Sequence, residues 1–536
     1  MNSNVTAASG SFSFPSNQSS LMGQLRIQTS PLYSNIIQAQ AAGYLEGFLT
    51  AELIFDHYMN LCDYYSKSFI NSFDLGRWLS KNKEWIRSQI TSCKSDEQAP
   101  PPFQSKSSPP FPYSQTDEPC TFWGALEIVL AQFDGLIAGY NAYVRTKGSS
   151  TDLEILQEFD FLLMNSIGDL SSISKLMDPG TNSDGLWSNS SAADIRRLIS
   201  RGGHCSALIK VTPDLEDILI GHSTWGAYAT MLRIYKHYDF ALQGALNGHS
   251  SFASYPGLIG SNDDWYVLGS GLVVTSTSHD LHNASLVDEI EINAALSWHR
   301  VLAANLLAGS GSQWTFWASF QNSGSNPGQY AVVDLKRFQP KQQLGPGLLT
   351  VLEIAPGIQI SEDVTTQLVT GYWPSYNVPY FKEMYDSLGF KQLFRIQSDR
   401  GVDFEAVALG LSYELSPRAK LFRRDAVKIL NLDGMKSVIR SNGWPVDSFS
   451  AASPWDAICG RGDLDPLAPD VFGCYDGKVT NYKLAMARVS YATSAPPVVG
   501  NMPFSWESCT SDLCRFTLHR AQPNNFDGAA WQLQQP

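Results

Sequence analysis

The chain has 536 residues, of which 43% are hydrophobic and 17% charged, so its length predicts several domains or one large α/β assembly. Its formal net charge of −13 argues against nucleic acid as a partner, because phosphate binding needs a clustered positive field. No apolar run approaches the ~20 residues that span a bilayer, so we expect no transmembrane segment.

The first half of the chain is predicted to be helical. Residues 1–30 are expected to form an N-terminal extension, and residues 31–204 a helical N-terminal fragment. Apolar side chains recur every three or four positions over residues 31–91, which indicates helices. A Pro-rich insertion at residues 94–118 has almost no aliphatic side chains and is expected to be exposed. Further helices are predicted at 121–143 and 151–177, with a polar loop at 179–191.

From Cys205 onward, short β-rich runs alternate with helical patterns. Because helices come first and strands mixed with helices follow, the order favours a layered α+β body. We expect residues 205–536 to form this mixed fragment and to pack with the N-terminal fragment as one body. The predicted strands lie at 206–211, 217–221, 265–277 (two strands), 330–335 and 348–354, with a helix at 287–307.

Eight cysteines and four glycosylation acceptors suggest an oxidising or endolysosomal compartment. The acceptor patterns begin at Asn4, Asn17, Asn189 and Asn283. The close pairs Cys459/Cys474 and Cys509/Cys514 suit short-loop disulfides, whereas the pairing of Cys62, Cys93 and Cys120 is left open. Metal binding is the alternative for paired cysteines. It is disfavoured because no pair has C-x-x-C spacing and only His519 lies near one.

Residues 1–20 have neither the basic region nor the apolar region of a secretory signal. A start that lacks its signal peptide would reconcile this segment with the cysteines and the acceptor patterns. We therefore expect a lysosomal or secreted glycoprotein.

The segment GGHCSALIKVTPDLEDILIGHSTW at 202–225 combines a cysteine with a predicted hairpin. Two glycines precede Cys205, a strand begins directly after it, and a second strand returns to His222. A cysteine in this position suits an N-terminal-nucleophile hydrolase, because cleavage before it frees an α-amine beside its own thiol. With a reference pKa of ~7.7–8.0, that amine can accept the thiol proton near neutral pH. Alternatively, Cys205 is a small buried apolar residue and His222 a core residue with its hydrogen bonds satisfied.

Two weaker patterns point to other chemistry. Residues 221–225 (GHSTW) resemble the start of a serine-hydrolase nucleophile elbow, but Trp225 stands where that motif needs glycine. Asp263 and Asp264 are adjacent, so their carboxylates are expected on different faces, with a turn or hydrogen-bonding role.

Six separated blocks carry a family resemblance that extends from about Tyr33 to the C-terminus, apart from the Pro-rich insertion. On these blocks the chain resembles the phospholipase B-like (laminal-ancestor-like) family of the N-terminal-nucleophile fold. The blocks are CSALIKV…HSTW at 205–225, SYPGLIGSNDDWYVLGSGLV at 254–273, NSGSNPGQYAVVDLKRF at 322–338, YWPSYNVPYF at 372–381, SPRAKLFRRD at 416–425 and GRGDLDP…DGKVT at 460–480.

The resemblance implies a four-layer αββα core and a site built around Cys205. Autocatalytic cleavage between His204 and Cys205 would give two fragments that stay associated. By matching motif, Cys205 is the nucleophile, with His222 in its site. Asn377 would donate to the oxyanion and Arg418 would place a positive charge near the nucleophile. No cofactor or metal is implied.

Alternatives and departures accompany these assignments. Asn377 could be a turn residue before Val-Pro, and Arg418 could sit in a structural ion pair. His204 stands where a small residue is expected. Asp465 replaces the Asn of the D-L-N-P motif, and residues 473–475 (GCY) replace Gly-Gly-Ile.

The family name implies removal of acyl chains from phospholipids. The same machinery cleaves linear amides, so an amidase acting on N-acyl substrates is an alternative. A non-catalytic lipid- or glycan-binding glycoprotein is the rival from another functional class, since fold does not determine function. The oligomeric state is left open.

Overall fold

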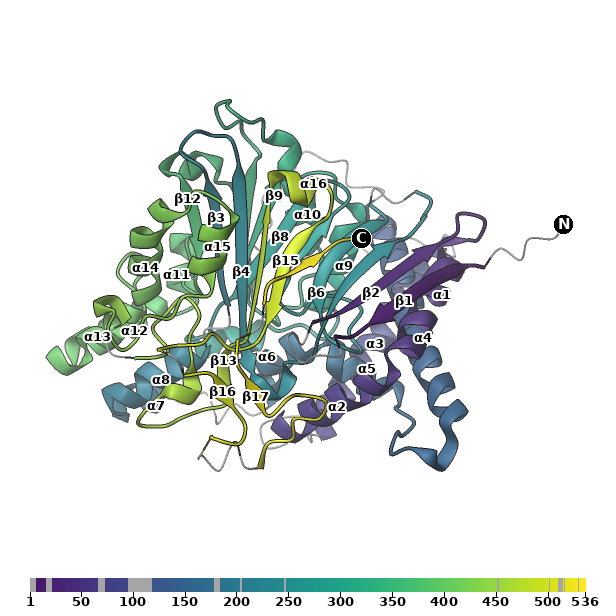
Figure 1. The fold of residues 1–536 in the computed structure, drawn as a ribbon, viewed down its shortest axis with the longest axis horizontal. Coiled ribbons are helices and arrows are strands. Elements are labelled where there is room, and N and C mark those ends of the chain that lie inside the picture. The colour runs from purple at the N-terminus through teal and green to yellow at the C-terminus, as the bar shows by residue number, and fades with distance from the viewer. Residues whose placement is uncertain are drawn as a thin grey trace.

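The computed structural model describes residues 6–15, 22–65, 73–94, 118–177, 184–202, 205–244, 247–450, 453–500, 502–509, 514, 516–528 and 530–536. Within these residues the chain forms two large β-sheets with helices on either side (Figure 1). Asn4, Asn17, His204 and residues 95–117 of the predicted insertion lie outside the described residues.

The larger sheet has nine strands, and its first two come from the segment predicted as an N-terminal extension. Leu25 and Ile27 face the helices and Met22 faces the other sheet, so buried apolar side chains on both faces explain why this short segment joins the sheet. The pairing of β2 with β5 is parallel and every other pairing is antiparallel. In spatial order the strands are β1 (Ala8–Ser13), β2 (Met22–Thr29), β5 (Arg233–Asp239), β6 (His249–Ser254), β7 (Tyr266–Leu268), β8 (Leu272–Ser278), β9 (Gly328–Asp334), β10 (Leu349–Ala355) and β11 (Ile358–Asp363).

The second sheet has seven strands and contains the predicted hairpin. Every residue of β3 is buried, as expected for a strand covered on both faces. In the β3–β4 pair, Cys205 lies opposite Thr224 and Ala207 opposite His222. The strands in order are β12 (Tyr372–Ser375), β3 (Cys205–Val211), β4 (Ile218–Ala227), β14 (Asp476–Asn481), β15 (Ser490–Ser494) and β18 (Gln532–Gln534), with β13 (Phe472–Cys474) paired to β4. A separate two-stranded sheet joins β16 (Phe504–Ser505) to β17 (Asn525–Phe526).

The two large sheets pack face to face, and alternate residues of the nine-stranded sheet point to opposite sides. Tyr235 and Val273 share a core cluster with Leu208 of β3. Their sequence neighbours Ile234 and Val274 instead pack among helical residues. This two-residue period produces one core between the sheets and another beneath the helices.

Helices cover the outer faces of both sheets (Figure 1). The nine-stranded sheet packs against α1 (Asn35–Leu49), α4 (Glu118–Lys147), α9 (Ser297–Leu307) and α10 (Gly311–Ser319). The other sheet packs against α11 (Lys382–Ser387), α12 (Phe390–Asp399), α14 (Pro417–Asp425) and α15 (Leu432–Ile439). The remaining helices are α2 (Ala51–Tyr65), α3 (Phe73–Lys94), α5 (Glu158–Asn165), α6 (Ile167–Met177), α7 (Asp184–Asn189), α8 (Ala192–Gly202), α13 (Glu405–Gly410) and α16 (Tyr482–Met486).

Helix α4 packs against α1 through glycines. A Cβ atom added at Gly43 would lie 1.9 Å from the Gln132 carbonyl oxygen, and one at Gly139 would lie 2.0 Å from the Tyr44 carbonyl oxygen. Among the described helices, the segment Cys120–Lys147 is long and apolar enough to cross a membrane by these two criteria. Because 61% of its apolar window is buried inside the protein, it also has the character of a core helix.

Several boundaries differ from the sequence-based expectations. The helix predicted at 151–177 is two helices, α5 and α6, and the first begins only at Glu158. The predicted helix at 287–307 begins only at Ser297, because Asp169 of α6 accepts hydrogen bonds from the Ser297 backbone N–H and hydroxyl. The side chain that caps this helix is therefore remote in sequence. The predicted loop at 179–191 contains the short helix α7.

Three disulfides cross-link the described chain. The predicted Cys459–Cys474 and Cys509–Cys514 pairs are confirmed. A third bridge, Cys93–Cys120, joins α3 to α4 across the Pro-rich insertion. Cys62 and Cys205 are free.

Two of the glycosylation acceptors fall on described residues. Asn189 is exposed at the end of α7. Asn283 is only partly exposed, and its Nδ2 donates to the Ser387 carbonyl oxygen over 3.1 Å. Glycosylation stays a prediction at both positions.

A buried ion pair ties the N-terminal helices to the nine-stranded sheet. Glu46 of α1 lies 2.6 Å from Lys236 Nζ of β5, and both side chains are at most 1% exposed. The Lys236 ammonium also donates to the Tyr255 carbonyl oxygen over 3.0 Å. Its positive charge therefore depends on Glu46 for compensation.

We predict that Glu46→Gln lowers the free energy of unfolding by ~3–5 kcal/mol, because it leaves the Lys236 charge buried without its carboxylate. Urea unfolding followed by circular dichroism measures this loss. Glu52→Gln is the matched control, since Glu52 is 61% exposed and a surface pair contributes at most ~1 kcal/mol. Equal losses in the two variants would contradict the importance of the buried pair.

Candidate active site

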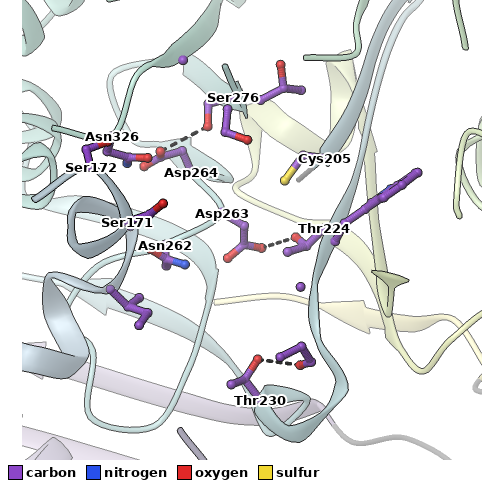
Figure 2. Close-up of a pocket in the computed structure, with 18 of the residues that line it drawn as sticks. Ser171, Ser172, Cys205, Thr224, Thr230, Asn262, Asp263, Asp264, Ser276 and Asn326 are labelled. Atoms are coloured by element: carbon purple, nitrogen blue, oxygen red, sulfur yellow. Dashed lines mark hydrogen bonds between the residues drawn. The ribbon is translucent and has the colours of Figure 1, made fainter. Parts of the chain in front are cut away.

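Cys205, the first residue of β3, lines a cavity of about 320 Å³ (Figure 2). The walls come from both large sheets and from helices α2 and α6 of the N-terminal region. Aromatic side chains and hydroxyl, amide or carboxyl groups share the lining, a mixture typical of small-molecule sites. The polar lining includes Ser171, Ser172, Lys175, Thr224, Asn262, Asp263, Asp264, Ser276, Asp280 and Asn326, and the aromatic lining includes Tyr64, Tyr65, Trp225, Tyr255, Tyr330, Phe472 and Tyr475.

The Cys205 thiol is protonated at neutral pH in the uncut chain. Its side chain is almost fully buried, with the residue 6% exposed. Burial raises the pKa of the thiol to about 12, although the positive charge of Lys478 acts in the opposite direction. A nucleophilic thiolate at this position therefore requires a nearby base or added positive charge.

Thr224, opposite Cys205, is held by three polar contacts. Its hydroxyl donates to Asp263 over 2.8 Å, and its backbone N–H donates to Asp476 over 2.7 Å. The Lys478 ammonium donates to the same hydroxyl over 2.5 Å. The strand position facing the nucleophile is thus fixed by side chains from two other segments.

Four buried charges form the base of this arrangement, and we call them the inter-sheet charge cluster: Arg233, Asp263, Asp476 and Lys478. All four side chains have no exposed surface. Lys478 Nζ lies 2.7 Å from Asp263 and 2.8 Å from Asp476, while Arg233 lies 2.7 Å and 3.1 Å from the same two carboxylates. Two cations balance two anions, so the burial of each is compensated.

The charge cluster keeps the Asp263 carboxyl ionised. Burial acts to raise its pKa, but the charges of Arg233 and Lys478 outweigh burial and hold the pKa far below its ordinary value.

His222 lies beside the charge cluster rather than in the cavity lining described above. Its Nε2 is 2.9 Å from the Ser276 carbonyl oxygen, so Nε2 carries the proton, and its buried Nδ1 has no partner among the described residues. Burial, reinforced by Lys478, lowers the pKa of His222 well below its usual value. His222 is therefore a neutral imidazole.

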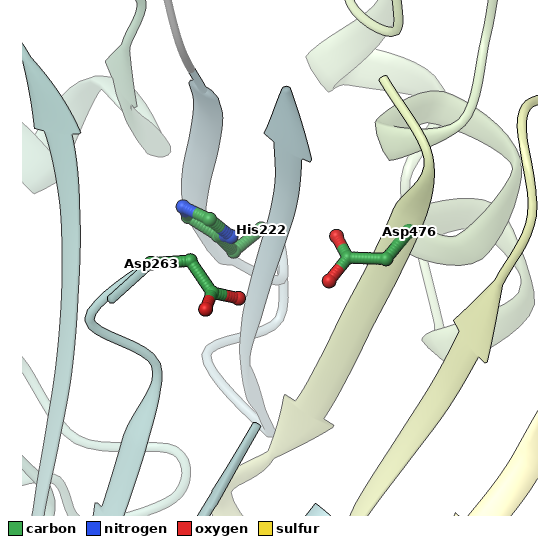
Figure 3. Close-up of side chains that lie close together, drawn as sticks. All are labelled: His222, Asp263 and Asp476. Carbon is green, nitrogen blue, oxygen red and sulfur yellow. The ribbon is translucent and has the colours of Figure 1, made fainter. Parts of the chain in front are cut away.

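His222, Asp263 and Asp476 have the residue types of a metal site, with their ligand atoms within 4.8 Å of one another (Figure 3). Both carboxylates already bind the ammonium of Lys478 and the guanidinium of Arg233. A divalent cation here would lie against two fixed positive charges, so the residues present do not fit a metal ion.

Arg418 binds the backbone of the predicted nucleophile. Its guanidinium donates to the Cys205 carbonyl oxygen over 2.7 Å and to the Ser206 hydroxyl over 3.3 Å, and it lies over the Trp225 ring at 4.9 Å. Arg418 sits at the start of α14, in a second cavity of about 50 Å³. The predicted positive charge is near Cys205, but its hydrogen bond to that residue is made with the main-chain carbonyl oxygen.

Asn377 lines the same second cavity, which shares Trp225 and Asp280 with the first. Its backbone is left-handed, with φ of 69°, an unusual conformation for a residue other than glycine. One of its amide hydrogens binds the Ser278 carbonyl oxygen over 2.8 Å, and its Oδ1 has no partner among the described residues. The same amide nitrogen makes a second, longer contact of 3.4 Å with the Ser278 hydroxyl.

Asp264 points away from Asp263, as expected for adjacent residues (Figure 2). It accepts a hydrogen bond from the Ser276 hydroxyl over 3.1 Å. Burial raises the pKa of Asp264 to about 7, and it also raises the pKa of Asp280 to about 6 against the charges of Lys175 and Arg418. Two carboxyl groups on the cavity wall therefore titrate close to neutral pH.

The sequence alone did not predict that Thr224, Asp476 and Lys478 take part in the site. All three lie in blocks that carry the family resemblance, and the Asp476–Lys478 spacing of two residues places both side chains on one face of a strand. That spacing is the signal that could have identified the pair. Their ionic partners Arg233 and Asp263 could not be chosen without the tertiary structure.

Comparison with known proteins finds close relatives over nearly the whole chain. The phospholipase B family model matches residues 8–532. Phospholipase-B 81 of Drysdalia coronoides is 35% identical over 516 residues, covering 95% of this chain and 85% of that protein. Phospholipase B-like 1 of Bos taurus is 36% identical over 499 residues, covering 92% and 82% of the two chains. The Homo sapiens protein of the same name is 36% identical over 503 residues, covering 93% and 82%.

The Asp264 carboxyl makes stability depend on pH in a definite direction. Its raised pKa means that the folded state keeps this proton while the unfolded chain loses it, so the stabilisation present below pH 3.8 is lost as pH rises to about 7. We predict that the free energy of unfolding of Asp264→Asn, relative to that of the wild type, rises by up to ~4 kcal/mol between pH 4 and pH 8. Urea unfolding at both pH values measures the gain, with the exposed Asp288→Asn as a control for lost charge. A constant difference between Asp264→Asn and wild type would contradict the prediction.

Proposed function

The chain belongs to the phospholipase B family, and we propose that it removes acyl chains from phospholipids with Cys205 as the nucleophile. The family model and the relatives confirm the resemblance predicted from the sequence blocks. The observation that carries the assignment of the nucleophile is the position of Cys205, at the first residue of a buried strand and on the wall of the main cavity. Of the two free cysteines among the described residues, only Cys205 lines this cavity.

Maturation is the first step of the proposal, and we assign the four layers to an N-terminal-nucleophile hydrolase core. The Cys205 sulfur attacks the carbonyl carbon of residue 204, and the peptide nitrogen leaves as the Cys205 α-amine, giving a thioester. Water then hydrolyses the thioester, which frees the thiol and leaves a carboxylate on residue 204. Two observations support the assignment. The hairpin starts at Cys205, and the Arg418 guanidinium holds the Cys205 carbonyl group.

The α-amine supplies the base that the buried thiol lacks. In the uncut chain the thiol pKa of about 12 leaves almost no thiolate at neutral pH. A free α-amine with a pKa of ~7.7–8.0 accepts the thiol proton as the sulfur attacks the ester carbonyl. The alcohol leaves with that proton, and a thioester to the acyl chain remains. Water attacks the thioester, the amine again accepts a proton, and the fatty acid departs.

Asn377 is the proposed oxyanion donor. In the β12–β3 pair Ser375 lies opposite Ala207, so two further residues bring Asn377 to the level of Cys205. A developing oxyanion would replace the long 3.4 Å contact between this amide and the Ser278 hydroxyl, and such an oxyanion contact contributes ~2.7–4 kcal/mol in other hydrolases. His222 and the charge cluster hold the strands behind the nucleophile in this proposal and make no contact with substrate.

An amidase acting on linear N-acyl substrates is the second candidate, because the thioester chemistry is the same for an amide. The compartment is proposed to be lysosomal or extracellular, which the three disulfides support. A lipid- or glycan-binding protein that never matures is the non-enzymatic rival.

We predict that Cys205→Ala reduces phospholipid hydrolysis by ~10³-fold or more, since loss of a nucleophile removes the covalent route. Fatty acid release from phosphatidylcholine in mixed micelles measures this, and an N-acyl amide with the same chain distinguishes the amidase. Cys62→Ala is the matched control, because Cys62 is the other free cysteine and lies outside the cavity lining. Retention of a tenth or more of wild-type turnover in Cys205→Ala would remove the assigned nucleophile.

A further inference from the structure

One end of the main cavity gathers hydroxyl and amide side chains together with the Asp264 carboxyl. Ser171 and Ser172 come from α6, Asn262 and Asp264 from the loop between β6 and β7, and Asn326 from the residues before β9. Figure 2 shows these side chains together on the side of the cavity opposite Cys205 and Thr224. We call this set the polar end of the cavity.

Three of these side chains lack protein partners. No described residue hydrogen-bonds to the side chain of Ser171, Ser172 or Asn262, although Ser172 is only 5% exposed. Buried polar groups are nearly always hydrogen-bonded in folded proteins. The buried Ser172 hydroxyl therefore needs water or a ligand in the cavity, and the exposed Ser171 and Asn262 side chains are open to hydrogen-bond the same ligand.

The polar end is held in a strained and tightly packed arrangement. Asp264 and Asn326 both have left-handed backbones, with φ of 45° and 58°. Asn326 Nδ2 donates to the Ser297 hydroxyl over 3.1 Å, and a Cβ atom added at Gly168 would lie 2.9 Å from Asn262 Oδ1. Such strain persists where the surroundings impose it and concentrates at functional sites.

The charges around the polar end disfavour an anionic ligand. Asp264 belongs to the set, and Asp280 lies on the same cavity wall. The positive charges of Arg233 and Lys478 are already paired with the ionised Asp263. The lysine in the cavity lining is Lys175 of α6. Serine, asparagine and a partly protonated aspartate both donate and accept hydrogen bonds, as alcohol groups do.

We propose that the polar end of the cavity is a subsite that binds the hydroxyl groups of a polyol portion of the acylated substrate. This proposal rests on the proposed function, because the polyol carries the acyl chain to Cys205. Two parts of a phospholipid supply this chemistry: a hydroxylated headgroup such as glycerol or inositol, and the free hydroxyl of a lysophospholipid backbone.

Substrate pairs that differ in hydroxyl groups test the subsite. Phosphatidylglycerol is compared with phosphatidylcholine of the same acyl chains, and lysophosphatidylcholine with its 2-O-methyl ether. We expect the wild type to favour the hydroxylated member of at least one pair. Ser171→Ala/Asn262→Ala should lower that preference in kcat/KM about tenfold or more, because two hydrogen bonds to the substrate hydroxyl groups are lost.

The pair whose preference falls identifies the source of the hydroxyl group. Ser174→Ala is the matched control, because Ser174 lies on the same helix, its hydroxyl donates to the Ser171 carbonyl oxygen, and it is absent from the cavity lining. Wild-type preferences within twofold of unity for both pairs, or preferences unchanged in the double variant, would overturn the subsite.

A binding measurement separates this proposal from the proposed function. Calorimetric titration of Cys205→Ala protein with glycerophosphoinositol and glycerophosphocholine reports on the polar end without turnover. Preferential binding of glycerophosphoinositol that the double variant abolishes supports the subsite even if no lipid is hydrolysed. Equal binding of the two compounds counts against the subsite even if phosphatidylcholine is hydrolysed.

Discussion

The placement of Cys205 depends on four charges buried between two β-sheets. Arg233 and Asp263 come from the nine-stranded sheet and its connections, and Asp476 and Lys478 from the other sheet. An unpaired ion in such a position costs several kcal/mol, so each charge must meet its partners. The ion pairs therefore tie the two sheets together, and the cluster also holds Thr224, the residue opposite Cys205.

The same arrangement explains how the N-terminal helices contribute. Residues of α2 and α6 complete the cavity that Cys205 lines, and Glu46 of α1 compensates the buried Lys236. Under the proposed maturation, the two fragments must remain associated. Separation would open the cavity and break the ion pair between Glu46 and Lys236. The nucleophile is supplied by one fragment, while part of the polar end comes from the other.

The sequence predicted the local features well and the long-range ones poorly. The β3–β4 hairpin and two disulfides follow from residues close together in the chain, and Cys205 stands out by its position before a strand. The strands at residues 8–29 were missed because they join the sheet by pairing with β5, about 200 positions away. Arg418 was expected to act near the nucleophile, but only the fold places its guanidinium on the Cys205 carbonyl oxygen. The charge cluster likewise joins residues separated by more than 200 positions.

N-terminal sequencing of lipid-hydrolysing protein after incubation at acidic pH tests the central claim most directly. The account predicts two chains that co-purify, one of which begins at Cys205 with a free α-amine. Full activity in material that contains only the uncut 536-residue chain would contradict it, since the buried thiol would then react without the base that cleavage provides.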